Sequence, residues 1–164
     1  EKLVREKLAG ARRVALLGVG STLRADDGAG MAVVGRIAAA FPHNEYPNLM
    51  CCLGETAPEN FSGKICAFRP DHLMVIDAAG LGKSPGEFAD IDPRDVGGPT
   101  YCSHLLPLKV MVDYIEGQVG NTTSLIGIQY GDIGFDRDMT DEVKAAVDAL
   151  CQALEAALRN LSLQ

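Results

Sequence analysis

The chain has 164 residues, a formal net charge of −7, and apolar and charged fractions of 47% and 23%. This length and composition predict a single domain, spanning residues 1–164, with a sizeable core. The acidic charge and the lack of a basic patch argue against a nucleic-acid or anionic-membrane partner. No apolar run is long enough to span a membrane, and residues 1–10 lack the apolar segment of a signal peptide.

The five cysteines match no disulfide framework, because their number is odd and no Cys-x-x-Cys pair occurs. Reduced thiols are typical of an intracellular environment, so we expect a cytoplasmic protein. We further expect it to be a monomer.

Apolar runs alternate with helical periodicity along the whole chain. In chain order the pattern predicts a helix over 2–9, a strand over 14–17, a helix over 28–40, a strand over 48–53, a helix beginning near 56, strands over 73–76 and 86–91, a helix over 106–115, a strand over 124–129, and a final helix capped by Thr140. Such alternation predicts an α/β fold: a mostly parallel sheet with helices on both faces.

A glycine turn follows the first predicted strand and leads into a helix. Gly18 and Gly20 fit the start of a dinucleotide-binding loop, but Leu23 stands where its third glycine is needed. Asp26 and Asp27 follow at the helix entry, where a phosphate would meet two negative charges. A flavodoxin-like nucleotide or flavin binder is therefore disfavoured, also because the chain has no Trp and only 5% aromatic residues. Carboxylates at this position suit a cation better.

Two further polar residues stand at places where such sheets bind ligands. Asp77 directly follows the third predicted parallel strand, and His104 precedes a predicted helix. Each residue alone is more often a helix cap or an ordinary loop residue. Together with Asp27, however, they form a mixed set of two carboxylates and an imidazole that leaves coordination positions open. An imidazole favours Zn, Ni, Co or Fe over Mg or Ca, but the set does not name one metal.

Several motifs occur together in one order from about Val14 to the final helix. They resemble those of the hydrogenase maturation proteases, and most closely the branch that serves hydrogenase 3 and related enzymes. The motifs are Gly18-Val-Gly20-Ser-Thr-Leu-Arg-Ala-Asp-Asp-Gly28-x-Gly30, Thr56-Ala-Pro-Glu-Asn60, Val75-Ile-Asp77-Ala-Ala, Pro85-Gly-Glu87, Ser103-His104-x-x-Pro107-Leu108 and Gly127-Ile-Gln129.

The resemblance implies an activity and a set of site residues. Members of the family are endopeptidases that remove a C-terminal extension from the large-subunit precursor of nickel–iron hydrogenase after nickel insertion, and they recognise the bound nickel. The family's metal-contacting and catalytic positions correspond to Asp27, Asp77 and His104, and its glycine turn to Gly18 and Gly20. Nickel would arrive with the precursor, although another divalent metal could bind in vitro. The family fold is a three-layer α/β/α arrangement around a twisted, mainly parallel five-stranded sheet.

Two departures from the family pattern stand out. Ser21 replaces an Asn after the glycine turn, and Leu53-Gly54-Glu55 replaces an Asp-Gly-Gly segment. If the missing Asp does chemistry in relatives, this chain either uses Glu55, as a substrate-binding or basic group, or binds the precursor without cutting it. The alternative function is thus a non-proteolytic nickel-sensing or precursor-binding maturation protein.

The identity of the general base stays open between two carboxylates. Asp26 and Glu55 are the candidates, although we expect Asp26 to stabilise the loop while Asp27 faces the site. No convincing Ser-His-Asp set is present in the sequence. A nucleophilic Cys102 beside His104 is disfavoured, because two residues so close on a loop make a poor pair.

Overall fold

The computed structural model describes residues 1–92 and 105–161. In chain order the elements are α1 (Lys2–Leu8), β1 (Val14–Val19), η1 (Ala25–Gly28), α2 (Ala29–Ala40), β2 (Leu49–Glu55), η2 (Pro58–Phe61), α3 (Ser62–Phe68), β3 (His72–Ala79), β4 (Phe88–Ile91), α4 (Leu105–Val119), β5 (Thr122–Gln129) and α5 (Asp141–Arg159). The prefix η marks a short 3₁₀ helix. The described elements thus follow the alternation that the sequence predicts.

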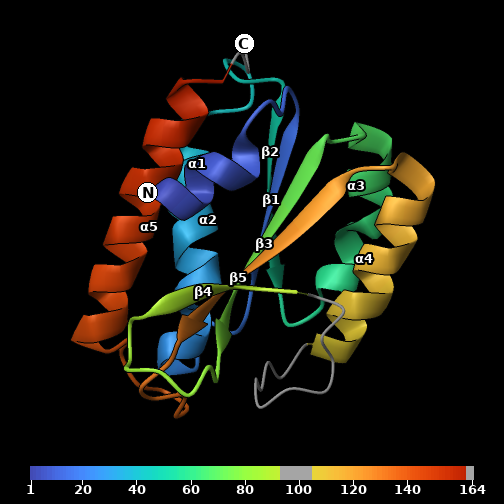
Figure 1. Cartoon of the computed structure of the whole chain (residues 1–164). Helices are drawn as coiled ribbons and strands as arrows, with labels where there is room; N and C mark the ends of the chain where they lie inside the picture. The colour runs from blue at the N-terminus through green and yellow to red at the C-terminus, as the bar shows by residue number, and fades with distance from the viewer. Residues whose placement is uncertain (93–104, 162–164) are drawn as a thin grey trace.

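The strands form one five-stranded sheet in the order β2-β1-β3-β5-β4. Four of them are parallel, and only β4, at one edge, runs antiparallel to its neighbour β5. Figure 1 shows the sheet twisting between two groups of helices. The expected three-layer α/β/α architecture with a mostly parallel sheet is confirmed.

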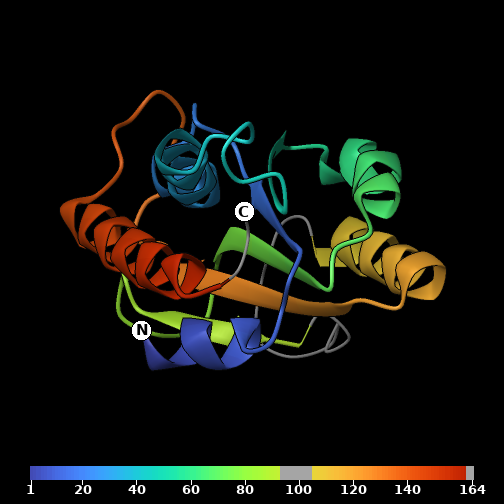
Figure 2. The ribbon, with the colours of Figure 1, turned by 90° about the horizontal axis from the view of Figure 1, so that it is seen from above.

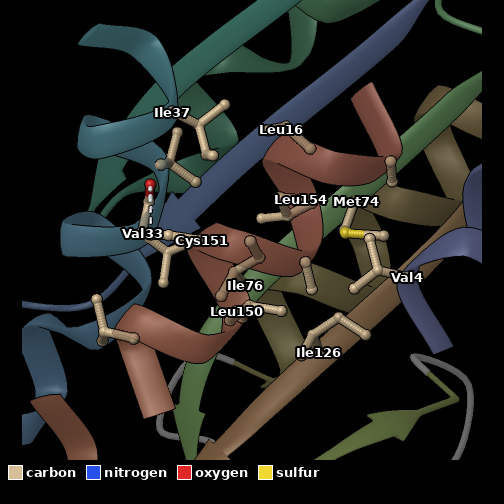
Figure 3. Close-up of a cluster of buried hydrophobic side chains, with 14 of the residues drawn as sticks. Val4, Leu16, Val33, Ile37, Met74, Ile76, Ile126, Leu150, Cys151 and Leu154 are labelled. Carbon is tan, nitrogen blue, oxygen red and sulfur yellow. Dashed lines mark hydrogen bonds between the residues drawn. The ribbon is translucent and has the colours of Figure 1, made fainter. Parts of the chain in front are cut away.

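Helices cover both faces of the sheet and create two cores. On one face α1, α2 and α5 pack over the sheet, and the side chains of this core include Val4, Ile37 and Leu154 (Figure 3). On the other face α3 and α4 cover a second core, which includes Ile65 and Ile115. Seen from above in Figure 2, α2 and α5 lie to one side of the sheet and α3 and α4 to the other.

The sequence of the interior strand β1 is apolar throughout because the strand has no exposed face. All six of its residues are buried, and successive side chains enter opposite cores. Leu16 belongs to the core under α2 and α5, whereas Leu17 belongs to the core under α3 and α4. A strand buried on both faces has no solvent side, so its sequence lacks polar alternation.

The final helix begins where the sequence predicts. The hydroxyl of Thr140 accepts a hydrogen bond from the backbone N–H of Val143 at 3.4 Å, and Asp141 and Glu142 occupy the first turn. These carboxylates favour the positive end of the helix dipole. The expected apolar stripe, from Val143 to Leu158, is buried.

Strand β3 is longer than predicted. The sequence places Asp77 after the strand, yet pairing with β5 continues through Asp77 opposite Gly127 to Ala79 opposite Gln129. The boundary was wrong because the length of the partner strand, rather than the first polar residue, sets where the ladder ends. Among residues 1–92 and 105–161, no helix is long and apolar enough to cross a membrane.

Candidate functional site

The glycine turn packs a helix directly onto the sheet. A Cβ on Gly18 would lie 2.6 Å from the carbonyl oxygen of Gly30, and a Cβ on Gly30 would overlap the carbonyl oxygen of Ile76 in β3. Gly20 has φ +113°, and a Cβ there would overlap the carbonyl oxygen of Asp27. The start of α2 therefore lies against the carboxyl ends of β1 and β3, an approach that only glycine permits.

Asp27 closes this turn and remains partly open to solvent. Its Oδ2 accepts a hydrogen bond from the backbone N–H of Ser21 at 2.8 Å. In the part of the chain that the structure describes, its Oδ1 accepts no hydrogen bond. A backbone N–H that a phosphate would need is thus taken by the chain's own carboxylate, and one carboxylate oxygen is left for an external ligand.

Asp26, the neighbouring acid, has a different environment. It is completely buried, and Thr140 donates to it through its backbone N–H, at 2.7 Å, and through its hydroxyl. Its Oδ2 also accepts from the backbone N–H groups of Gly131 and Asp132, at 2.8 and 2.9 Å. The expectation that Asp26 stabilises the loop is therefore confirmed. Both oxygens of this buried side chain already accept hydrogen bonds from the chain itself, which counts against its alternative role as the general base.

These bonds join η1 to a distant segment that the sequence analysis missed. Besides the contacts of Asp26, the N–H of Asp136 donates to the carbonyl of Leu23 at 2.9 Å, and Nε of Arg24 donates to the carbonyl of Ile133 at 3.2 Å. Residues 131–140 therefore form one wall beside the glycine turn. The adjacent acidic pair was a sequence signal for this contact. Two neighbouring carboxylates at a helix start rarely have the same role, so one of them was expected to bind another part of the chain.

Asp77 lies inside the sheet at the same end. Its side chain is completely buried, and η1 contacts β3 at this end of the sheet. Along β3 the side chains alternate, so Asp77 lies on the face of Val75 and Ala79, which pack in the core under α3 and α4. A carboxylate is costly to bury unless it is paired or coordinated, so a residue of this type is retained here only where it has such a role.

The third predicted metal-contacting residue, His104, lies outside the described residues, as does Cys102. Within residues 1–92 and 105–161, no group of three or more His, Cys, Asp or Glu side chains is arranged to hold a metal ion. The structure thus brings Asp27 and Asp77 to one end of the sheet.

Glu55 ends β2 beside the glycine turn. Its carbonyl accepts the N–H of Gly20 at 2.9 Å, and its own N–H lies 3.3 Å from Sδ of Met31. Its backbone is in the left-handed region, with φ +51°, a conformation that L side chains other than Asn and Asp seldom adopt. Backbone strain of this kind occurs preferentially at functional sites. The Glu55 side chain is exposed at the carboxyl end of the sheet.

Leu53 and a shallow pocket lie next to this end. The pocket has a volume of about 310 Å³, and Thr22, Met31, Leu53 and Met139 are among its lining residues. Leu53 itself is 44% exposed, which is unusual for a leucine on a strand of a packed sheet. The position at which the chain departs from its expected Asp therefore faces solvent beside the glycine turn.

Comparisons with known proteins agree with this fold. Residues 31–157 match the family model described as hydrogenase maturation protease. The hydrogenase 3 maturation protease of Escherichia coli K12 is 37% identical over 141 residues, which cover 85% of this chain and 87% of that protein.

Solved structures give the same result. The hydrogenase maturation protease HycI of Thermococcus kodakarensis superposes with a TM-score of 0.88 at 30% identity, covering 96% of this chain and 99% of that one. The solution structure of the endopeptidase HycI from Escherichia coli has a TM-score of 0.75 at 32% identity, covering 93% and 97%. This chain therefore belongs to the hydrogenase maturation protease family and is a peptidase.

Proposed function

We propose that this chain removes the C-terminal extension of a nickel–iron hydrogenase large-subunit precursor after nickel insertion. The observation that supports it most is that two carboxylates, Asp27 and Asp77, lie at the carboxyl end of the sheet in a member of this family. We assign the reaction to the cytoplasm and to a monomeric enzyme.

Nickel belongs to the substrate in this proposal. Asp27, Asp77 and His104 contact the nickel of the precursor and serve as metal and catalytic residues. Support comes from the Asp27 carboxylate, which is partly exposed and has one oxygen outside the Ser21 bond. A three-residue set leaves coordination positions to the precursor's own ligands, so that only a loaded precursor is anchored.

Peptide hydrolysis also needs a group that accepts a proton from water. Glu55 is the candidate, because it is exposed beside the glycine turn whereas Asp26 is buried and fully engaged. Glu55 would take one proton from water as the water oxygen bonds to the peptide carbonyl carbon, and it would pass this proton to the amine of the released extension as the C–N bond breaks. Gly18 and Gly20 contribute by bringing the backbone of the turn close to the substrate.

A direct test follows the size of the precursor by mass spectrometry. Wild-type protein is mixed with nickel-loaded and with nickel-free large-subunit precursor, in parallel with Asp27→Asn. Asp113→Asn is the control, because Asp113 is an exposed carboxylate of α4 that pairs with Lys109. We expect trimming of loaded precursor by wild type and control, and none by Asp27→Asn. Equal trimming by Asp27→Asn, or none by wild type, would overturn the proposal.

The alternative function, precursor binding without cleavage, is favoured by one observation, the presence of Leu53 where the family pattern has Asp. Restored cleavage in Leu53→Asp, against none in wild type, would support it.

A further inference from the structure

Strand β2 forms an unusually open edge of the sheet. It ends the sheet beside β1, and its residues from Leu49 to Gly54 carry no charge and no proline. Proteins usually protect such edges with short strands or charged residues. The opposite edge strand, β4, has both protections: it is four residues long, and Asp90 on it pairs with Lys7 of α1.

The peptide groups of Cys51 and Leu53 point away from the sheet. The carbonyl of Asn48 accepts the N–H of Val14 at 2.9 Å, so its peptide group faces β1. Peptide groups along a strand alternate in direction, which places those of residues 49, 51 and 53 on the outer side. Within residues 1–92 and 105–161, no partner bonds to the outer groups of Cys51 or Leu53.

Among the described residues, those that hydrogen-bond to this outer side reach only its beginning. The N–H of Leu49 donates to the carbonyl of Tyr46 at 3.0 Å, and Nδ1 of His43 lies 3.2 Å from the carbonyl oxygen of Leu49. Beyond these contacts Cys51 is half-buried and Leu53 is exposed.

Two hollows lie beside β2 on the side of α2. One hollow of about 260 Å³ includes Ala38, Phe41 and Cys51 in its lining, and the pocket of about 310 Å³ described above lies at Leu53. Between them a Cβ on Gly35 of α2 would meet Cδ2 of Leu53 at 4.0 Å, so Leu53 lies over the small residues of this helix. We call the outer side of β2 and these two hollows the edge groove.

We propose that the edge groove binds an extended, apolar segment of the precursor next to the scissile bond, paired as an added strand against Cys51 and Leu53. This inference rests on the proposed function. The edge groove adjoins the site, because the pocket at Leu53 is also lined by Thr22 of the glycine turn and by Gly28, which directly follows Asp27. An extended chain beside β2 therefore passes close to Asp27.

Strand addition satisfies both chemical features of the edge groove. Main-chain hydrogen bonds to Cys51 and Leu53 supply affinity for an extended chain, and alternate side chains of that chain enter the two hollows and supply specificity. In this arrangement Leu53 contacts the substrate and selects an apolar segment. Its departure from the Asp of the family pattern then changes specificity.

The test measures trimming kinetics of nickel-loaded precursor and, separately, binding of a fluorescent peptide that spans the scissile bond and the extension. The variants are Leu53→Asp, Leu53→Ser and the control Val110→Asp, which changes a 64% exposed residue of α4 on the far side of the sheet. For Leu53→Asp we expect KM and the peptide Kd to rise about tenfold or more with kcat within about twofold, and a smaller rise for Leu53→Ser. Val110→Asp should match wild type.

The outcomes separate this inference from the proposed function. Unchanged KM and peptide Kd in both Leu53 variants, or a raised kcat in Leu53→Asp, would overturn the role of the edge groove even if wild type trims normally. If the wild type does not trim the precursor, the proposed function fails. The peptide-binding measurement alone then tests the edge groove. Binding that Leu53→Asp weakens would then support the groove, and no binding by wild type would overturn it.

Discussion

The two ends of the central sheet both bury polar side chains, but they satisfy them differently. At the amino end His72 is 5% exposed, and its two ring nitrogens lie 2.8 Å from the hydroxyls of Thr122 and Ser124. At the carboxyl end Asp26 is equally well satisfied, whereas Asp27 keeps one oxygen that no described residue donates to. Burial of a polar group alone therefore does not identify a functional site. A better indicator is a partly exposed polar group with an atom that still lacks a hydrogen-bond partner.

The largest expected effect comes from Asp77→Asn at the carboxyl end. The change keeps the shape of the side chain but removes the charge that would contact nickel. We expect trimming of loaded precursor to fall by about 1000-fold while the circular dichroism spectrum is retained. Near-normal trimming would show that Asp77 does not contact the nickel. Of the described residues, Asp27 alone would then remain as a nickel-contacting residue at the carboxyl end of the sheet.

The second effect separates the two adjacent acids. Asp26→Ala leaves the backbone N–H groups of Gly131, Asp132 and Thr140 without their buried acceptor. We expect a loss of about 3–4 kcal/mol in the free energy of unfolding. Urea denaturation measures this loss, and Asp27→Asn is the comparison. For Asp27→Asn we expect a loss of less than about 1 kcal/mol, because Asp27 accepts one backbone hydrogen bond. Equal losses would contradict the division of roles.

The third effect is pH-dependent and belongs to the amino end. Burial, and to a smaller extent the charge of Lys7, lowers the pKa of His72 to about 4, against 6.5 in an unfolded chain, while Asp90 opposes the shift. As the pH falls, the unfolded state therefore binds a proton on His72 before the folded state does. The contribution of neutral His72 to the free energy of unfolding is complete above about pH 6.5 and is lost as the pH falls toward 4. The loss is at most about 3 kcal/mol.

Urea denaturation at pH 7, 5.5 and 4.5 checks this prediction. His72→Gln keeps hydrogen-bonding groups but cannot titrate, so its stability should fall less steeply over this range. Parallel curves for the variant and the wild type would show that His72 does not produce the dependence.

The smallest effect concerns the charge next to His72. Lys7→Met removes a positive charge that lowers the pKa of His72 and an ion pair with Asp90 that is about one-third exposed. We expect the pKa of His72 to rise and the free energy of unfolding at pH 7 to change by less than about 1 kcal/mol. NMR titration of the His72 ring measures the shift; a lower pKa in the variant would contradict it.

The fold was predictable because its signals are local. Continuous apolar runs such as β1 mark strands buried on both faces, and Thr140 with two acids after it marks a helix start. The boundary of β3 was not predictable, since it depends on how far β5 runs beside it.

The sequence by itself determined the glycine turn, its acids and the family resemblance, because each depends on residue type and spacing along a short stretch. Only the tertiary structure decided what each acid does. Asp26 is a structural residue because residues 131–140, far along the chain, supply its donors, and Leu53 faces solvent because β2 is an edge of the sheet. Both facts arise from packing between segments that no local pattern connects.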